Sequence, residues 1–312
     1  MARSENLVFC GTPQFAVPTL DKLVEAGFNV RLILSQPDRP KGRGLGLVGS
    51  PVKEAASRLG LEIYQPEGIR QNEELRAKLE QIAPAAIIVV GYGRIIPKWM
   101  LELPKYGNIN LHASLLPKYR GAAPIQWAIA NGEQITGVTT MRIDEGLDTG
   151  DILLQKDLAI LDEDTSETMS PRLAAIGADL MVETLRGLTE STIRPVPQKD
   201  DEATLAPILK KEDGRIDFSL SAQEIYNRLR GFQPWPGAFT SFRGKMLNIT
   251  AARPCEERVP QAELQINDQL LVGCGNSTTL ELLEVQPEGK KRISARDFIH
   301  GYRPQRGEKL GH

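Results

Sequence analysis

The chain has 312 residues, enough for about two domains that each bury a core. Its 38 basic and 40 acidic residues nearly cancel, which excludes a strongly basic nucleic-acid-binding protein as a whole. Three cysteines and three histidines are too few and too scattered for a disulfide framework or a His/Cys metal site, so we expect no metal.

The first half of the chain alternates apolar runs with amphipathic segments. The apolar runs predict strands at residues 7–10, 30–35, 61–64, 85–90 and 108–111. The amphipathic segments predict helices at residues 17–26, 51–59 and 73–81, the first two closed by glycine. Because strands that are apolar throughout and alternate with helices are typical of a parallel sheet covered on both faces, the sequence predicts an α/β fold.

Two further strands are predicted at residues 137–143 and 152–158, on either side of an acidic, glycine-containing turn. A long helix is predicted at residues 166–188. These elements continue the same fold, so we expect one domain over residues 1–190.

The composition changes near Thr192. Residues 191–206 are polar and proline-rich, as expected of a linker. Beyond them the sequence predicts one helix, at residues 222–230, and strands at residues 238–242, 246–251, 270–273 and 279–284. This pattern indicates a small antiparallel barrel in residues 207–312. Trp235 is expected to pack within its proline-rich turn.

Charge and targeting signals add two expectations. Residues 207–312 carry 16 Lys and Arg against 13 Asp and Glu, a small basic excess that is compatible with a polyanionic partner. The first apolar run is too short for a signal peptide, and no stretch approaches the roughly 20 apolar residues of a membrane span. We therefore expect a cytoplasmic protein with no membrane partner.

Asn110 and His112 are the first candidates for chemistry, and His112 is the only histidine before residue 300. Because the two residues are two apart on a predicted strand, their side chains should point to the same face. An amide can donate to a developing oxyanion, and an imidazole can carry or release a proton near neutral pH. The pair alone also fits a buried histidine beside a turn asparagine.

Asp148 is the third candidate. It lies in the turn at residues 146–150, where two glycines would let the backbone approach a ligand closely. An ordinary hairpin turn has the same composition. Together with Asn110 and His112, however, the carboxylate completes a set suited to acyl transfer to an amine, because it can orient the imidazole and stabilise positive charge on it.

The segment at residues 36–50 holds four glycines and the cationic residues Arg39, Lys41 and Arg43. We expect a mobile surface loop that can close over an anionic ligand. Glycines 44, 46 and 49 match the letters of a dinucleotide-binding fingerprint, but residues 36–43 separate them from the preceding strand. A nicotinamide-dependent dehydrogenase therefore stays as a weaker alternative.

Taken in order, several segments resemble the methionyl-tRNA formyltransferases, a family of folate-dependent enzymes. The matching segments are residues 9–13, 36–44, 50–53, 91–97, 110–117, 119–126, 146–151 and 234–236. Single motifs among them occur in folate-dependent formyltransferases generally. The ordered set, with the loop and the C-terminal region, resembles this family in particular.

The resemblance implies transfer of the formyl group of 10-formyltetrahydrofolate to the amino group of methionyl initiator tRNA, a one-carbon reaction that serves translation initiation. It implies a Rossmann-like formyltransferase N-terminal domain, with a parallel-rich sheet, and an OB-like C-terminal β-barrel that binds tRNA. It also implies Asn110, His112 and Asp148 as catalytic residues, and Arg39, Lys41 and Arg43 as tRNA contacts. We expect a monomer. The implied folate contacts are Val89, Val90, Gly91, Tyr92, Gly93, Ile95, Ser114, Leu115, Leu116 and Pro117.

Two other functions stay open on the sequence. Other formyltransferases or formyl-folate hydrolases that act on small molecules share the Asn, His and Asp set, so those three residues do not separate them. A noncatalytic RNA-binding module would not need the set at all. The cationic loop and the added C-terminal domain favour tRNA as the substrate.

Overall fold

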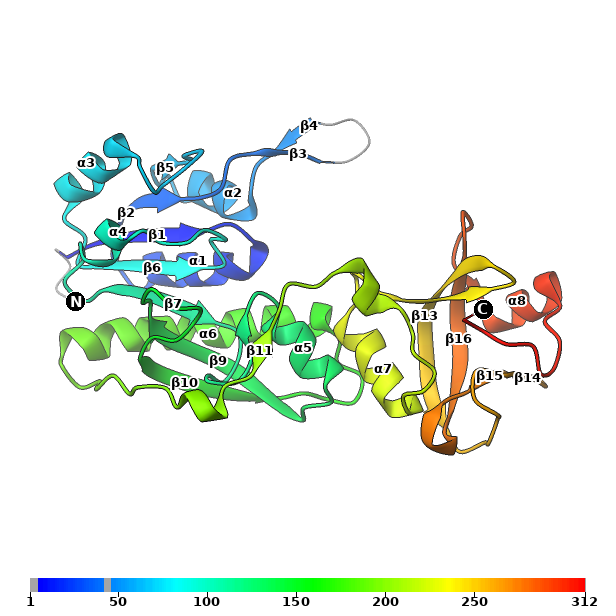
Figure 1. Ribbon diagram of the computed structural model, residues 1–312. Coiled ribbons are helices and arrows are strands. Elements are labelled where there is room, and N and C mark those ends of the chain that lie inside the picture. The colour runs from blue at the N-terminus through cyan, green and yellow to red at the C-terminus, as the bar shows by residue number, and fades with distance from the viewer. Residues whose placement is uncertain (1–4, 42–45, 312) are drawn as a thin grey trace. The chain divides into compact units, whose positions relative to one another are not determined.

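The computed structural model describes residues 5–41 and 46–311, which form two compact units (Figure 1). Unit 1 contains residues 1–121, 136–159 and 170–205, and unit 2 contains residues 122–135, 160–169 and 206–312. The expected domain ranges, 1–190 and 207–312, stay a prediction. Two short segments before residue 170 group with unit 2, and residues 170–205 group with unit 1.

Unit 1 is built on a seven-stranded sheet with the order β10-β9-β7-β6-β1-β2-β5. Its strands are β1 (Asn6–Gly11), β2 (Asn29–Leu34), β5 (Ile63–Tyr64), β6 (Ala86–Val90), β7 (Asn108–His112), β9 (Ile135–Arg142) and β10 (Ile152–Ala159). The five strands from β7 to β5 are parallel, and β9 runs antiparallel to β7. The predicted α/β fold with a parallel-rich sheet is confirmed.

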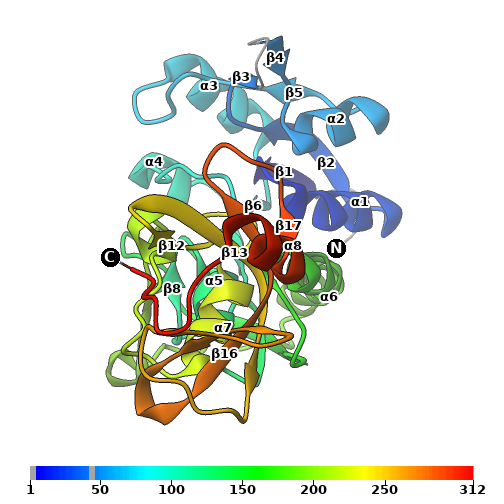
Figure 2. The ribbon, with the colours of Figure 1, turned by 90° about the vertical axis from the view of Figure 1, so that its right-hand side faces the viewer.

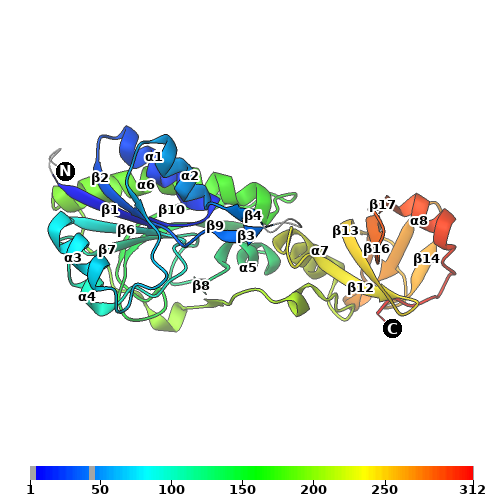
Figure 3. The ribbon, with the colours of Figure 1, turned by 90° about the horizontal axis from the view of Figure 1, so that it is seen from above.

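Helices cover both faces of this sheet, with α1, α2 and α6 on one side and α3 and α4 on the other (Figure 3). They are α1 (Val17–Glu25), α2 (Pro51–Arg58), α3 (Glu73–Ile82), α4 (Lys98–Leu101) and α6 (Ser166–Thr189). Side-chain caps fix two of the helix starts, because Ser50 Oγ accepts from Lys53 N at 3.1 Å and Asn72 Oδ1 accepts from Leu75 N at 2.8 Å.

The strand order explains where a ligand site can form in unit 1. The chain builds β1, β2 and β5 to one side and then returns to place β6 on the other side of β1. In open α/β sheets, ligands bind at the carboxyl ends of the strands beside such a change of direction. Residues 91–97 follow β6 at that edge, and β7 ends there with His112. The fold therefore brings the predicted site residues of β6 and β7 to one edge.

Unit 2 contains an antiparallel sheet with the order β12-β13-β16-β15-β14, and β17 pairs with β16. Its strands and helices are α5 (Pro124–Ala130), α7 (Ala222–Gly231), β12 (Ala238–Phe242), β13 (Lys245–Cys255), β14 (Leu264–Ile266), β15 (Leu270–Gly273), β16 (Thr279–Pro287), β17 (Ile293–Ser294) and α8 (Ala295–Tyr302). α8 lies beside the strands in Figure 2, and Phe298 from α8 packs edge-on against Phe242 with ring centroids 5.2 Å apart. Closure of this sheet into an OB-like barrel stays a prediction.

Several short elements complete the chain. They are the strands β3 (Arg39–Lys41), β4 (Gly46–Val48), β8 (Arg120–Gly121) and β11 (Leu205–Ala206), and single turns of 3₁₀ helix at residues 14–16, 200–202, 211–214 and 275–277. None of the helices in the described part of the chain has the length and apolar character needed to cross a membrane.

Two local predictions were wrong. Residues 36–50 were expected to form only a loop, but β3 and β4 pair there as an antiparallel hairpin. Each strand has only three residues, too few to stand out among glycines and prolines. Trp235 was expected to pack, but its exposed fraction is 56%. Phe232 fills the apolar position of that turn instead, because it is buried and meets Trp127 edge-on at 5.2 Å.

Candidate active site

Strand β7 carries the first two candidates near its carboxyl end. Asn110 is half-buried and lies opposite Val89 of β6, while the exposed fraction of His112 is 6%. Their spacing on one strand directs both side chains to the same face of the sheet. The Asn110 side chain has no hydrogen-bond partner among the described residues, so its amide can still donate to a ligand.

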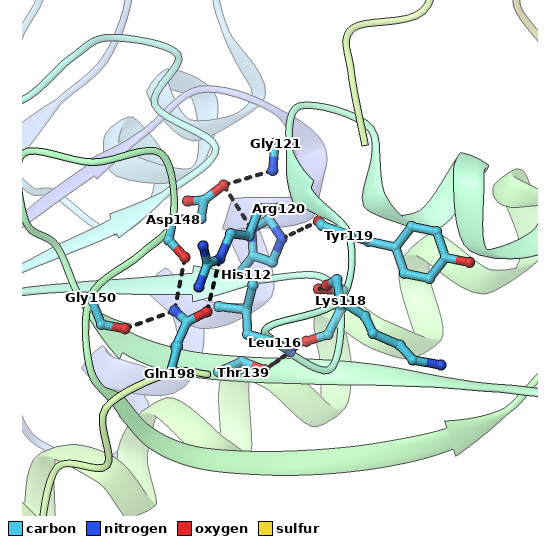
Figure 4. A network of polar contacts seen from close by, with 11 residues as sticks. His112, Leu116, Lys118, Tyr119, Arg120, Gly121, Thr139, Asp148, Gly150 and Gln198 are labelled. Atoms are coloured by element: carbon cyan, nitrogen blue, oxygen red, sulfur yellow. Dashed lines mark hydrogen bonds and ion pairs between the residues drawn. The ribbon is translucent and has the colours of Figure 1, made fainter. Parts of the chain in front are cut away.

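The contacts of the His112 ring define its protonation pattern (Figure 4). Nε2 lies 2.9 Å from the carbonyl oxygen of Tyr119, and a carbonyl can only accept a hydrogen bond, so Nε2 carries a hydrogen. Nδ1 faces Asp148 Oδ2 at 3.7 Å. In the neutral ring, Nδ1 therefore holds the lone pair. When the ring is doubly protonated, both N–H groups face oxygen atoms.

Asp148 takes up a backbone conformation that few residues adopt. Its φ is +52°, in the left-handed region that aspartate tolerates better than most side chains. The carboxylate oxygen that faces His112 also accepts from the Gly121 N–H at 2.9 Å. The carboxylate is thus held between a backbone donor and the imidazole, where it can stabilise positive charge on the ring.

Gly150 closes the turn that carries Asp148, and this position has no room for a side chain. A Cβ added there would lie 1.9 Å from the carbonyl oxygen of Arg142. We expect Gly150→Ala to lower the free energy of unfolding by about 1–3 kcal/mol, because the turn or the end of β9 must shift. Denaturant unfolding of the variant measures this loss.

Gly68→Ala is the matched control for that substitution, since a Cβ at residue 68 would meet no atom within 4 Å. An unchanged unfolding midpoint in Gly150→Ala would contradict the tight packing of the turn.

The predicted folate contacts divide by accessibility. Val89, Val90 and Tyr92 are buried, whereas Gly91 and Gly93 are exposed and the exposed fraction of Ile95 is 93%. In the second segment Ser114 and Leu116 are buried, and Leu115 and Pro117 are half-buried. The Ser114 hydroxyl donates to the carbonyl of Lys118 at 2.6 Å.

The cationic loop is anchored at its base. Lys53 Nζ lies 2.5 Å from Asp38 Oδ2, and Gln65 Nε2 donates to Asp38 Oδ1 at 2.8 Å. The Lys53 ammonium and then the Gln65 amide hold the pKa of Asp38 below its usual value. Among the predicted tRNA contacts, Arg39 is exposed and Lys41 ends β3, whereas Arg43 lies outside the described residues.

The site offers proton and charge chemistry. Burial raises the pKa of the Cys10 thiol at the end of β1, so that group stays protonated. No group of three or more His, Cys, Asp and Glu side chains in the described part of the chain could hold a metal ion. An amide donor, an imidazole and a carboxylate on one face are suited to stabilising an oxyanion and handling the proton of an attacking amine.

Sequence reasoning missed two residues that surround this site. Arg120 is buried, and Gln198 reaches the Asp148 turn from a segment that was expected to be a linker. No pattern in the sequence connects Gln198 to a residue 50 positions earlier, because only the folded path of residues 196–204 brings them together.

Comparison with known proteins gives consistent results over both units. Residues 5–185 match the family described as formyl transferase, and residues 208–303 match the formyl transferase C-terminal domain. The chain is 66% identical over 306 residues to the methionyl-tRNA formyltransferase of Koribacter versatilis strain Ellin345, covering 98% of each chain. It is 59% identical over 301 residues to the methionyl-tRNA formyltransferase of Acidobacterium capsulatum, covering 95% of this chain and 96% of that one.

Solved structures share the fold at lower identity. WlaRD, a sugar 3N-formyl transferase with dTDP and 5-N-formyl-THF, superposes with a TM-score of 0.67 at 18% identity and covers 92% of this chain and 99% of its own. HypX from Aquifex aeolicus, in complex with tetrahydrofolic acid, superposes with a TM-score of 0.63 at 17% identity and covers 98% of this chain and 48% of its own.

Proposed function

This chain belongs to the formyl transferase family, and we propose that it transfers the formyl group of 10-formyltetrahydrofolate to the amino group of methionyl initiator tRNA. The observation that carries this proposal is the 66% identity to a methionyl-tRNA formyltransferase over 98% of both chains, which spans both matched domains. A sugar formyl transferase and an N-formyltransferase in complex with an amino-sugar nucleotide share the fold at 18% and 19% identity, so the fold alone does not separate these activities.

Asn110 and His112 act on the oxygen of the formyl group. When the amine attacks the formyl carbon, negative charge develops on that oxygen. The Asn110 amide, which has no other partner among the described residues, donates to it. The protonated Nδ1 of His112 supplies positive charge from the same face of β7, while Tyr119 holds the opposite ring nitrogen.

Asp148 serves this step through the imidazole. Its carboxylate, 3.7 Å from His112 Nδ1, stabilises the positive charge that the ring carries. It also offers an acceptor, directly or through water, for the proton that the amine loses as the new C–N bond forms. When the formyl carbon parts from the folate nitrogen, that nitrogen takes a proton. His112 donates this proton from Nδ1, the ring nitrogen that faces Asp148.

The residues at the carboxyl ends of β6 and β7 suit a flat, polar ligand such as the folate. Gly91 and Gly93 have φ values of +56° and +73°, which expose backbone at the edge of the sheet. Ile95 adds an exposed apolar surface beside them. We propose that residues 89–95 and 114–117 hold the folate, with backbone atoms at the buried positions and side-chain contacts from Ile95 and Leu115.

We propose that the cationic loop, residues 36–50, and the C-terminal region bind different parts of the tRNA. Arg39, Lys41 and Arg43 would contact the acceptor end, and residues 207–312 would bind the phosphate backbone. Residues 1–190 would carry the chemistry. We further propose that the protein is cytoplasmic and that it works as a monomer. Light scattering of the purified protein measures its oligomeric state.

Arg43→Ala is expected to raise KM for methionyl-tRNA by about tenfold or more, because a charge-assisted hydrogen bond contributes about 1.5–3 kcal/mol. KM for the folate should stay within about a factor of two, since the loop is assigned to the tRNA alone. Steady-state kinetics with each substrate varied in turn measures both constants, and Arg58→Ala, a surface arginine of α2, serves as the control. Equal effects on both KM values would contradict this assignment.

The proposed function is tested by a competition between acceptors. Purified protein is mixed with formyl-labelled 10-formyltetrahydrofolate and offered methionyl initiator tRNA, methionyl elongator tRNA, or an amino-sugar nucleotide. We expect label on the initiator tRNA and little on the others. Label on the sugar nucleotide, or release of free formate with every acceptor, would instead support one of the two alternative activities.

A further inference from the structure

Residues 196–204 lie against the active site, although their composition is that of a linker. Val196 pairs with Ile152 at the start of β10 through two backbone hydrogen bonds of 2.8 and 2.9 Å. At the other end of the segment, Thr204 N donates to the Pro117 carbonyl at 3.3 Å. The segment is thus fixed at both ends, and Gln198 lies between them.

The Gln198 side chain makes three hydrogen bonds in the site, using both N–H donors and its carbonyl oxygen (Figure 4). Its Nε2 donates to the carbonyl oxygens of Asp148 and Gly150, both at 2.8 Å. Its Oε1 accepts from Arg120 Nε at 3.0 Å. Because two carbonyls require a donor and the guanidinium requires an acceptor, only an amide in this orientation satisfies all three partners.

This contact acts on a residue of the site whose backbone lies in the left-handed region. Asp148 has a φ of +52°, a conformation that persists only where surrounding contacts define it. Gln198 holds the Asp148 carbonyl, and the Gly121 N–H holds the carboxylate at 2.9 Å. Release of the carbonyl would let the turn relax and move the carboxylate relative to His112.

The same segment also supports the opposite side of the imidazole. Thr204 Oγ1 accepts from Tyr119 N at 2.8 Å, and the Thr204 carbonyl accepts from Arg120 N at 2.8 Å. Tyr119 is the residue whose carbonyl accepts from His112 Nε2. Residues 196–204 therefore bond the backbone of both residues, Asp148 and Tyr119, whose oxygen atoms face the two nitrogens of the ring.

We propose that Gln198 is a positioning residue for formyl transfer: its amide fixes the Asp148 turn so that the carboxylate faces the His112 imidazole. This inference rests on the proposed function, because it assigns Gln198 to the same site. Gln198 touches neither the reacting atoms nor the proposed folate segments, so it acts on the chemical step through Asp148.

Gln198→Glu tests the proposal with almost no change in shape. The variant presents a carboxylate oxygen to two carbonyl oxygens, which repels the Asp148 turn while the contact with Arg120 remains. We expect kcat to fall about 10–100-fold, as small displacements of catalytic groups do, with KM for both substrates within about a factor of two. Gln81→Glu, a surface change on α3, should leave kcat unaltered.

A double mutant separates positioning from a general structural role. If Gln198 acts through Asp148, then Gln198→Ala should lower the single-turnover rate of the wild type at least tenfold and that of Asp148→Asn by less than about twofold. Gln198→Ala also replaces Gln198→Glu should the glutamate variant fail to fold, which its unfolding curve reveals.

Three results would overturn the proposal: unchanged kcat in both Gln198 variants, a rise in KM with unchanged kcat, or equal losses in the two backgrounds. A wild-type protein that transfers no formyl group to methionyl-tRNA would overturn the proposed function instead, so the two failures are distinguishable.

Discussion

His112→Ala is expected to lower the rate of formyl transfer by about 10³–10⁴-fold, because the variant loses the cation proposed to face the oxyanion and the acid proposed to protonate the leaving nitrogen. The fold should survive, since Tyr119 N still donates to Thr204 Oγ1 and the Asp148 carboxylate still accepts from the Gly121 N–H. Single-turnover transfer from labelled 10-formyltetrahydrofolate to methionyl-tRNA measures the rate, and thermal unfolding measures the fold.

His300→Ala provides the matched control, because that histidine is exposed on α8 and has no part in the chemistry. Its rate should equal that of the wild type. A folded His112→Ala variant with turnover close to that of the wild type would remove the imidazole from the mechanism. Loss of folding in the variant would show that the ring is chiefly a structural element of β7.

Asp148→Asn is expected to lower the same rate by about 10²–10³-fold. The amide keeps the shape of the side chain, and its oxygen can still accept from the Gly121 N–H. It removes the negative charge that faces His112 Nδ1 at 3.7 Å, so the protonated ring loses its stabilising partner. The KM values should change little, because the Asp148 carboxylate contacts the His112 ring and the Gly121 N–H rather than a substrate-binding segment.

Asp157→Asn, an exposed change on β10, controls for the loss of one acidic charge from unit 1. Full activity in Asp148→Asn would show that the charge is not needed and that the turn matters only for its shape. A large rise in KM with normal kcat would assign the carboxylate to substrate binding.

The regular core of the fold was predictable from the sequence. Residues 7–10 of β1 and all of β6 are continuous apolar runs. Such runs are typical of strands that are buried on both faces of a sheet. Ser50 and Asn72 mark the starts of α2 and α3, and Gly27 marks the end of α1. The helix α8, which contains Gly301, was not predicted.

The grouping of the chain into two units was not predictable. α5 comes early in the chain, yet it packs against α7, where a Cβ on Gly231 would lie 2.6 Å from the carbonyl oxygen of Gln126. Such close packing depends on two surfaces that meet only after folding. Composition marks the change near Thr192, but it says nothing about which earlier helix joins the later residues.

The candidate site was partly predictable. The two-residue period of a strand puts Asn110 and His112 on one face, and this follows from the sequence alone. The approach of Asp148 to His112 depends on the left-handed turn and on the Gly121 N–H, so it came from the resemblance rather than from spacing. The contribution of Gln198 required coordinates, because its partners are backbone carbonyls that leave no sequence pattern.

The most direct test of the mechanism is a crystal structure of the protein with an unreactive analogue of 10-formyltetrahydrofolate. The proposed chemistry predicts the formyl oxygen at about 2.7–3.1 Å from the Asn110 amide nitrogen and from Nδ1 of His112, with the Asp148 carboxylate beside the ring. A formyl group bound beyond hydrogen-bond reach of both side chains would contradict it.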